Sequence, residues 1–416
     1  MWDRILDQML ARLIKAGTLV LTLPDGRTRR YGDGIGPQVV VTLHDPALPA
    51  RLVLNPDLAV GEAYMAGTLT IEGDDLHGLL ALAITNTTET GTIWWHHTLR
   101  SARTALRTLS QFNPTPRARR NVAHHYDLSG ELYDLFLDAD KQYSCAYFKQ
   151  PTDTLELAQA QKKAHIAAKL RIEPGMRVLD IGCGWGGLGL TLARDHGARV
   201  LGVTLSAEQH KIASRRAELA GLAGSAGQPG QVEFRLTDYR AVTGQFDRIV
   251  SVGMFEHVGV PHYREYFRHV GQKLAPDGIA LIHTIGRASP PSFTSPWITR
   301  YIFPGGYVPA LSELAAAVEK EGLWTTDIEV WRLHYVLTLR HWHDRFMANI
   351  DRARALYDER FCRMWRYYLV AAELTFSHGR QCVFQVQLAH RQQAVPLTRD
   401  YITAPLPHSR LAQAAE

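Results

Sequence analysis

The feature that most constrains this chain is a glycine-rich turn at the end of a short apolar run. Residues 178–187 read Val-Leu-Asp-Ile-Gly-Cys-Gly-Trp-Gly-Gly. Glycine lets the backbone approach a ligand without a Cβ collision, and a helix that starts there presents free N–H groups to an anion. The segment therefore predicts a strand, a turn and a helix that together bind a ligand at the carboxyl end of the strand.

Around this turn, strand-like and helix-like patterns alternate. Helices are expected at 188–196, 207–220 and 262–274, and two further helices at 337–350 and 351–374. Strands are expected at 177–181, 199–203, 232–236, 246–252, 278–285, 327–333 and 382–389. Such alternation is typical of α/β proteins with a mostly parallel sheet. The pattern predicts a doubly wound, seven-stranded, Rossmann-like domain.

The first part of the chain has a different pattern, without a catalytic constellation. Apolar residues at helical spacing predict an amphipathic helix over 2–15, which suits either core packing or a membrane surface. The remaining patterns predict strands at 18–23, 38–43 and 50–54, and helices at 57–66 and 76–84. A polar segment with Asn113-Pro114-Thr115-Pro116 then suggests a linker. We expect a small α+β domain over 1–115 and a catalytic domain over 116–416.

The distribution of charge along the chain is more informative about binding partners than the net charge is. The chain has 46 Lys and Arg against 41 Asp and Glu, a formal charge of +5, which does not by itself indicate nucleic-acid binding. No acidic residue occurs between 90 and 126, where arginines stand at Arg100, Arg103, Arg107, Arg117, Arg119 and Arg120. Such a run can face anionic lipid or phosphate. A solvated linker explains it equally well.

Cysteine spacing and hydropathy indicate the cellular compartment of the protein. Cys145, Cys183, Cys362 and Cys382 have neither CxxC nor zinc-site spacing, so we expect no metal and a reducing compartment. No apolar run reaches the ~18–20 residues of a membrane span. Charged residues interrupt the N-terminal apolar stretch, which therefore lacks the core of a signal peptide. We expect a cytoplasmic protein that can sit on a membrane surface.

The glycine spacing separates two classes of cofactor. Gly182, Gly184 and Gly186 give G-x-G-x-G, whereas dinucleotide folds favour G-x-G-x-x-G and an acid ~20 residues later for the ribose. The next strand ends in Gly-Val-Thr-Leu-Ser at 202–206, without an acid. With Asp180 before the first glycine, this favours S-adenosylmethionine (SAM) over NAD. The turn would then meet the methionine end of SAM.

Several separated motifs together resemble the cyclopropane fatty acid synthases, SAM-dependent enzymes that add a methylene across the cis double bond of a phospholipid acyl chain. Besides the glycine turn, the motifs are NVAHHYDL at 121–128, QYSCAYF at 142–148, GVTLSAEQ at 202–209, MFEHVG at 254–259, HTIG at 283–286, FPGG at 303–306, and HY at 334–335 followed by TL at 338–339 and Trp342. The resemblance covers residues ~121–390. The N-terminal segment resembles the extra domain of the longer bacterial members, less specifically.

The resemblance implies a set of SAM contacts. The methionine end would be held by Tyr143, Ser144, Gly182, Gly184 and Trp185. Thr204 and Gln209 would serve the ribose in place of the missing acid, and Asp238 and Tyr239 would flank the adenine. Each lies at the end of an expected strand or in the adjoining loop, where doubly wound sheets bind ligands.

The chemistry of the implied reaction is demanding. Methylation of an alkene leaves a carbocation, which must be shielded from water until a base removes a proton from the new methyl and the ring closes. The resemblance implies a bound bicarbonate as that base. It would be held by Glu256, His283 and Tyr335, with backbone groups at Cys145 and Ile285. A nucleophilic Cys145 and a second base at His257 are alternatives.

Three alternative functions remain. A relative with the same cofactor site could methylate an acyl chain or a small molecule without closing a ring. A non-enzymatic lipid-binding protein would need only the N-terminal helix and the arginine run, and the glycine spacing opposes an NAD oxidoreductase. The resemblance favours cyclopropanation, with phospholipid acyl chains at the inner face of the membrane as partner, no nucleic acid, and a homodimer.

Overall fold

The computed structural model describes residues 1–90, 111, 130–224 and 228–403. The chain divides into two compact units, and neither is one continuous stretch. Unit 1 combines Met1–Arg107, Ser292–Pro304 and Val336–Gln381, and unit 2 combines Thr108–Pro291, Gly305–Tyr335 and Cys382–Glu416. The boundary expected near residue 115 lies outside the described residues, so the division into 1–115 and 116–416 stays a prediction.

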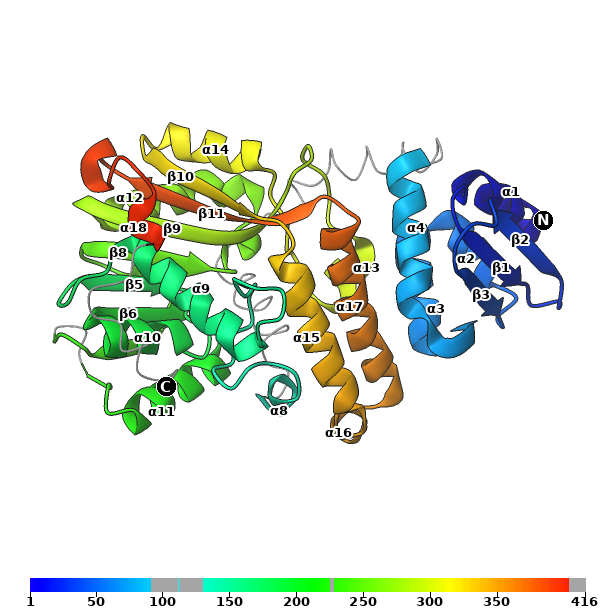
Figure 1. The fold of residues 1–416 in the computed structure, drawn as a ribbon, viewed down its shortest axis with the longest axis horizontal. Helices are drawn as coiled ribbons and strands as arrows, with labels where there is room; N and C mark the ends of the chain where they lie inside the picture. Colours follow the sequence, from blue (N-terminus) through cyan, green and yellow to red (C-terminus); the bar gives the residue numbers. More distant parts are fainter. Residues whose placement is uncertain (91–110, 112–129, 225–227, 404–416) are drawn as a thin grey trace. The chain divides into compact units, whose positions relative to one another are not determined.

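Unit 2 contains the predicted seven-stranded sheet. Its order is β10-β11-β9-β8-β5-β6-β7, in which the run from β9 to β7 is parallel and β10 pairs antiparallel with β11 (Figure 1). The strands are β5 (Arg177–Ile181), β6 (Arg199–Thr204), β7 (Val232–Leu236), β8 (Phe246–Val252), β9 (Leu274–Arg287), β10 (Trp324–Trp331) and β11 (Gln381–Ala389). The doubly wound α/β fold is confirmed.

Helices cover both faces of this sheet, because its strands are apolar on both sides. Alternate residues of β5 enter two different cores: Leu179 and Ile181 pack in one, and Val178 in the other. The first core includes α12 (Tyr263–Lys273) and α14 (Leu311–Lys320). The second includes α9 (Leu155–Leu170), α10 (Gly187–His196) and α11 (Ala207–Leu219). Because β5, β6, β7, β8 and β9 run parallel, their carboxyl ends lie at one edge of the sheet, beside the loops that carry the sequence motifs.

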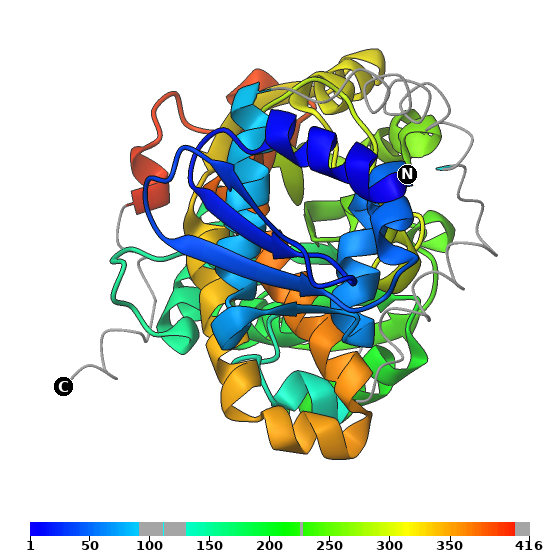
Figure 2. The same cartoon turned by 90° about the vertical axis from the view of Figure 1, so that its right-hand side faces the viewer.

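Unit 1 contains a four-stranded sheet in the order β2-β1-β3-β4. Its strands are β1 (Thr18–Thr22), β2 (Thr28–Gly32), β3 (Gln38–Leu43) and β4 (Leu69–Ile71). Helix α1 (Trp2–Leu13) lies alongside this sheet and buries Leu6 and Met9 (Figure 2). The Tyr31 hydroxyl donates to Asp7 on α1 at 2.8 Å. The apolar face of the N-terminal helix thus packs within its own unit.

One expected strand is wrong. Residues 50–54 belong to the helix α2 (Leu48–Leu54). Pro49 occupies the first turn, where its fixed φ favours a helix. Leu48, Leu52 and Val53 are buried at helical spacing. A short apolar run fits a strand and a buried helix equally well until packing decides.

The remaining helices of unit 1 come from both ends of the chain. They are α3 (Pro56–Ala66), α4 (Leu76–Thr90), α13 (Pro296–Tyr301), α15 (His334–Ala348), α16 (Ile350–Leu356) and α17 (Glu359–Ser377). The helix expected over 351–374 is divided, because Asp358 caps α17 by accepting the Phe361 N–H at 2.6 Å. Glu373 on α17 accepts from His77 on α4, which ties the N-terminal segment to the later helices.

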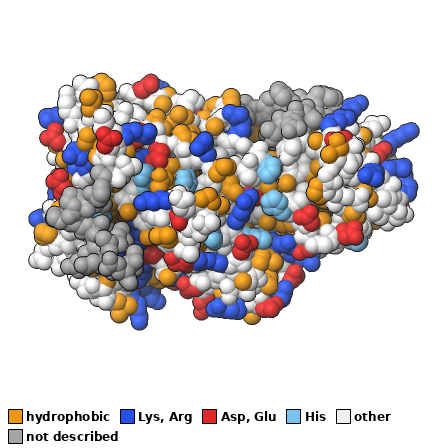
Figure 3. All heavy atoms as spheres, viewed as in Figure 1, with side chains coloured by type: hydrophobic (Ala, Val, Ile, Leu, Met, Phe, Trp, Pro, Cys, Tyr) orange, Lys and Arg blue, Asp and Glu red, His pale blue; other side chains and the backbone are white. Residues whose placement is uncertain are grey.

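The outer surface is mixed in charge. On the face shown in Figure 3, acidic and basic side chains are interspersed. The arginine-rich stretch of 100–120 lies outside the described residues. Among the helices that the structure describes, none combines the length and hydropathy needed to cross a bilayer.

Candidate active site

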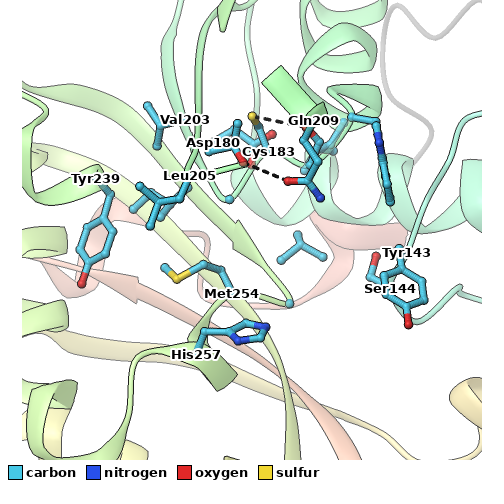
Figure 4. Close-up of a pocket in the computed structure, with 18 of the residues that line it drawn as sticks. Tyr143, Ser144, Asp180, Cys183, Val203, Leu205, Gln209, Tyr239, Met254 and His257 are labelled. Carbon is cyan, nitrogen blue, oxygen red and sulfur yellow. Dashed lines mark hydrogen bonds between the residues drawn. The ribbon is translucent and has the colours of Figure 1, made fainter. Parts of the chain in front are cut away.

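A pocket opens in unit 2 at the carboxyl ends of β5, β6 and β8 (Figure 4). Its walls come from the loop at 141–144, the glycine turn, the end of β6, and the loops at 237–240 and 252–258. All nine residues expected to bind SAM line this one pocket: Tyr143, Ser144, Gly182, Gly184, Trp185, Thr204, Gln209, Asp238 and Tyr239. The structure thus brings together residues that are spread over about a quarter of the chain. Their individual roles stay predictions.

Glycine is favoured at the positions of this turn for different structural reasons. Gly182, Gly184 and Gly186 have φ of 82°, 54° and 84°, in the left-handed region. A Cβ on Gly186 would lie 2.6 Å from the ring of Phe234, so that glycine is required for packing. A Cβ on Gly184 would meet no atom within 4 Å. Gly184 therefore borders open space in the pocket, as a glycine that admits a ligand should.

The expected ribose end is preorganised by a short polar network. The Thr204 hydroxyl donates to the side-chain oxygen of Gln209 at 2.9 Å. Ser206 caps α11 by accepting the Gln209 N–H at 3.2 Å. Thr204, Ser206 and Gln209 are all buried, so the Gln209 amide is held in one orientation at the rim of the pocket (Figure 4).

The expected adenine end carries an ion pair. The Asp238 carboxylate accepts from the Arg240 guanidinium through both oxygens, at 2.9 and 2.7 Å. Tyr239 packs edge-on against Tyr266, with ring centroids 5.5 Å apart, and burial raises the pKa of its hydroxyl. The aromatic face at this end is uncharged. An amino group bound by Asp238 would share the carboxylate with Arg240.

The expected methionine end is aromatic and includes a buried lysine. Tyr143 and Trp185 both pack on Tyr133, with centroids 5.3 and 4.8 Å away. Lys162 on α9 donates to the Ser144 hydroxyl at 2.8 Å. Motif analysis missed this lysine because it stands in a helix without a recognised motif. The sequence gives no local signal that separates it from the neighbouring Lys163.

Asp180, before the first glycine, is buried at the same pocket. Its Oδ2 atom has no hydrogen-bond partner among the described residues. Burial raises the pKa of this carboxyl to about 7. His257 also lines the pocket, and burial lowers its pKa to about 4, so its imidazole is neutral near pH 7. A role for His257 as a second base stays a hypothesis.

The five residues expected to hold bicarbonate are not among those that line this pocket. Two of them are in direct contact, because the Ile285 N–H donates to Glu256 Oε1 at 2.6 Å. Because the Ile285 N–H already donates to Glu256, it could contact bicarbonate only if the two acceptors shared it. Glu256 Oε2 is buried and has no hydrogen-bond partner among the described residues. Burial raises the pKa of Glu256 to about 7.

His283 on β9 is buried beside Trp331, and its Nδ1 lies 3.1 Å from the side-chain amide of Gln385. Burial, followed by the nearby Lys162 ammonium, lowers the pKa of His283 well below its usual range. The imidazole is therefore neutral near pH 7. The His283 carbonyl accepts the Gly253 N–H at 2.9 Å, which ties this strand to the pocket wall.

Cys145 and Tyr335 are both buried and belong to two segments that contact each other. The Phe148 N–H donates to His334 Nδ1 at 3.1 Å, and the rings of Tyr147 and His334 stack 4.8 Å apart. The Cys145 thiol donates to the Ala146 carbonyl at 3.4 Å. The structure thus joins the segments that carry these two residues, and the bicarbonate role of all five stays a prediction. Among the described residues, no cluster could hold a metal ion.

Comparison with known proteins gives the family. Residues 114–386 match the family model described as mycolic acid cyclopropane synthetase, and residues 5–91 match a domain of unknown function. The chain is 38% identical to the cyclopropane-fatty-acyl-phospholipid synthase of Escherichia coli K12, over 90% of each chain. It is 35% identical to the tuberculostearic acid methyltransferase UfaA1 of Mycobacterium tuberculosis, over 92% of this chain and 90% of that one.

Solved structures agree with this family. The mycolic acid cyclopropane synthase CmaA1, solved with SAH and CTAB, is 32% identical and superposes with a TM-score of 0.60, covering 67% of this chain and 99% of that one. The cyclopropane synthase MmaA2 of Mycobacterium tuberculosis gives a TM-score of 0.61 at 30% identity, with 67% and 99% covered. The chain therefore belongs to the cyclopropane fatty acid synthase family of SAM-dependent enzymes.

Proposed function

We propose that this protein transfers a methylene group from SAM to the cis double bond of an unsaturated phospholipid acyl chain and closes a cyclopropane ring. The observation that carries the proposal is the 38% sequence identity to the Escherichia coli synthase, which extends over 90% of this chain and includes both units. The pocket at the carboxyl ends of the parallel strands adds a site of the expected composition.

The residues of the pocket fit SAM. When bound, SAM supplies an electrophilic methyl group on a sulfonium. The glycine turn leaves open space at Gly184, and the Thr204–Gln209 pair offers a fixed polar rim where a ribose acid would otherwise stand. Tyr143 and Trp185, which both pack on Tyr133, would shield the methionine end from water.

Glu256 and His283 have the donor and acceptor chemistry that a bound bicarbonate needs. When bound, bicarbonate would supply the base that removes the proton needed for ring closure. Glu256 Oε2 is a buried acceptor that has no partner among the described residues, which suits the O–H of a hydrogen carbonate. His283 is neutral, so it can donate through one ring nitrogen without adding a charge. Tyr335 would contribute a second donor.

A second candidate is methyl transfer to an acyl chain without ring closure. UfaA1, named a methyltransferase, matches this chain over a similar length and at similar identity. The cofactor pocket cannot separate the two reactions, since both begin with methylation of the same double bond. The fate of the proton on the new methyl separates them.

The test is incubation of the purified protein with SAM and vesicles of a cis-unsaturated phospholipid. Mass spectrometry and proton NMR of the extracted lipid then follow the acyl chain. The proposal requires a gain of one CH₂, loss of the olefinic protons and appearance of cyclopropane protons. A methylated chain without those ring protons would favour the second candidate.

We also propose that the protein works as a homodimer at the cytoplasmic face of an anionic membrane. The acid-free arginine stretch supports the membrane part. Vesicle binding in the presence and absence of anionic lipid tests it.

A further inference from the structure

The cations that line the pocket differ in their partners. Lys141, Lys162 and Arg240 are the lysine and arginine residues of the lining. Lys141 forms an ion pair with Asp134, and Arg240 forms one with Asp238. Lys162, in contrast, donates to two neutral groups, the side-chain oxygen of Gln142 and the hydroxyl of Ser144, each at 2.8 Å. Among the described residues it has no carboxylate within ion-pair distance.

Lys162 is also deeply buried, with 1% of its surface exposed. An ammonium without a counter-ion costs several kcal/mol to remove from water, so such groups are rare unless a ligand uses them. Burial lowers the pKa of Lys162 to about 8, which leaves it mostly charged near pH 7. Asp138 opposes that shift from a greater distance, and its own carboxylate accepts the backbone N–H groups of Asp140 and Gln142.

The adjacent lysine shows what ordinary pairing looks like in the same helix. Lys163 is nearly as buried as Lys162, but its ammonium lies 2.5 Å from the Asp140 carboxylate. It is not among the residues that line the pocket. The two neighbouring lysines on α9 are thus similarly buried, but only Lys163 has a carboxylate partner among the described residues. Lys162, which lines the pocket, lacks one.

We propose that the Lys162 ammonium is the counter-ion of an oxyanion bound in this pocket, namely the carboxylate of the methionine moiety of SAM. The inference rests on the proposed function, which puts SAM in the pocket. Because the Ser144 oxygen accepts from Lys162, its hydroxyl proton is directed elsewhere and can be donated to the same carboxylate. Lys162 and Ser144 together would then recognise the carboxylate through charge-assisted hydrogen bonds.

A bound bicarbonate has the same oxyanion chemistry. The Lys162 charge also acts on His283, which is expected at the bicarbonate site, so the experiment must separate the two anions.

The test is calorimetric titration of the full chain with SAM and with decarboxylated SAM, which keeps the sulfonium and the adenosine but lacks the carboxylate. The variants are Lys162→Met, which keeps the apolar stem, Lys162→Arg, which keeps the charge, and Lys163→Met as the matched control. Circular dichroism and thermal melting establish that each variant is folded. Bicarbonate is titrated separately into the SAH-bound protein.

We expect Lys162→Met to bind SAM about 10- to 100-fold more weakly, the usual range for losing a hydrogen-bonded charge. Its affinity for decarboxylated SAM should be unchanged or higher, since the buried positive charge is gone. Lys162→Arg should regain part of the preference for SAM, and Lys163→Met should keep the wild-type preference. If Lys162→Met does not fold, the proposal is tested with Lys162→Arg, which should still prefer SAM to decarboxylated SAM. Equal affinity of Lys162→Arg for the two compounds would overturn it.

The proposal is overturned if Lys162→Met weakens both compounds equally or weakens neither. If SAM binding is unaffected and only bicarbonate binding weakens, the carboxylate assignment is overturned in favour of bicarbonate. If the wild-type protein binds neither SAM nor decarboxylated SAM, the proposed function itself fails.

Discussion

Replacing Glu256 by glutamine should slow the enzyme and stabilise its fold at the same time. The carboxyl group is buried, and one of its oxygens has no hydrogen-bond partner among the described residues. Burial raises its pKa from 4.5 to about 7. Because one pKa unit corresponds to about 1.4 kcal/mol, ionising Glu256 in the folded protein should destabilise it by roughly 3.5 kcal/mol relative to the unfolded chain.

The sign of this effect sets the pH window. Below pH 4.5 the carboxyl is protonated in both the folded and the unfolded state, so it makes no difference to stability. As the pH rises from 4.5 to about 7, the unfolded chain ionises first and the folded protein loses stability. The full penalty is present above pH 7. Glu256→Gln removes it, so the variant's stability gain should grow over this window.

The assay is urea unfolding of wild type and Glu256→Gln at several pH values between 4.5 and 8, in bicarbonate-free buffer. Glu319→Gln, at an exposed position on α14, is the matched control for the loss of a glutamate carboxylate. In parallel, methylene transfer by Glu256→Gln should be about 10- to 100-fold slower, because an amide replaces the unpaired acceptor. A stability difference for Glu256→Gln that is the same at every pH would refute the raised pKa of this buried carboxyl group.

Three further outcomes are expected. Gly184→Val should abolish SAM binding in calorimetry while the fold persists, because the added side chain enters open pocket space; Gly186→Val should unfold, because its Cβ collides with Phe234. Near-normal SAM affinity in Gly184→Val would exclude this turn as the site. Tyr335→Phe should be slow but bind SAM, and added bicarbonate should partly restore its rate; indifference to bicarbonate in both wild type and variant would point to a protein side chain as base. Pelleting with anionic vesicles should fall with added salt and after charge reversal at Arg117, Arg119 and Arg120, at roughly 1 kcal/mol per arginine; equal pelleting on neutral vesicles would exclude electrostatic docking.

Much of unit 2 could be predicted from the sequence, because each strand of a doubly wound sheet is an apolar run stopped by a turn. β5, β7 and β8 begin and end at the expected residues. The nine residues that the resemblance implies for SAM line one pocket because parallel strands end at the same edge of the sheet. Glycine spacing alone pointed to the turn, and the other residues followed from the family resemblance.

The errors have a common cause in long-range packing. Residues 50–54 have an apolar pattern that suits a strand, but their neighbours bury it as the helix α2. The grouping of Val336–Gln381 with the N-terminal segment depends on contacts such as His77 with Glu373, which no local pattern predicts. The missing counter-ion of Lys162 is likewise visible only once α9 is packed.

In the proposed reaction, the methyl carbon of SAM ends in a three-membered ring on the acyl chain. The most direct test uses SAM labelled with three deuterium atoms on its methyl group, with mass spectrometry and NMR of the lipid product. Ring closure removes one of these atoms, so the product should retain two deuterium atoms and no alkene. A product that retains all three, or that keeps a double bond, would show that this protein does not close the ring.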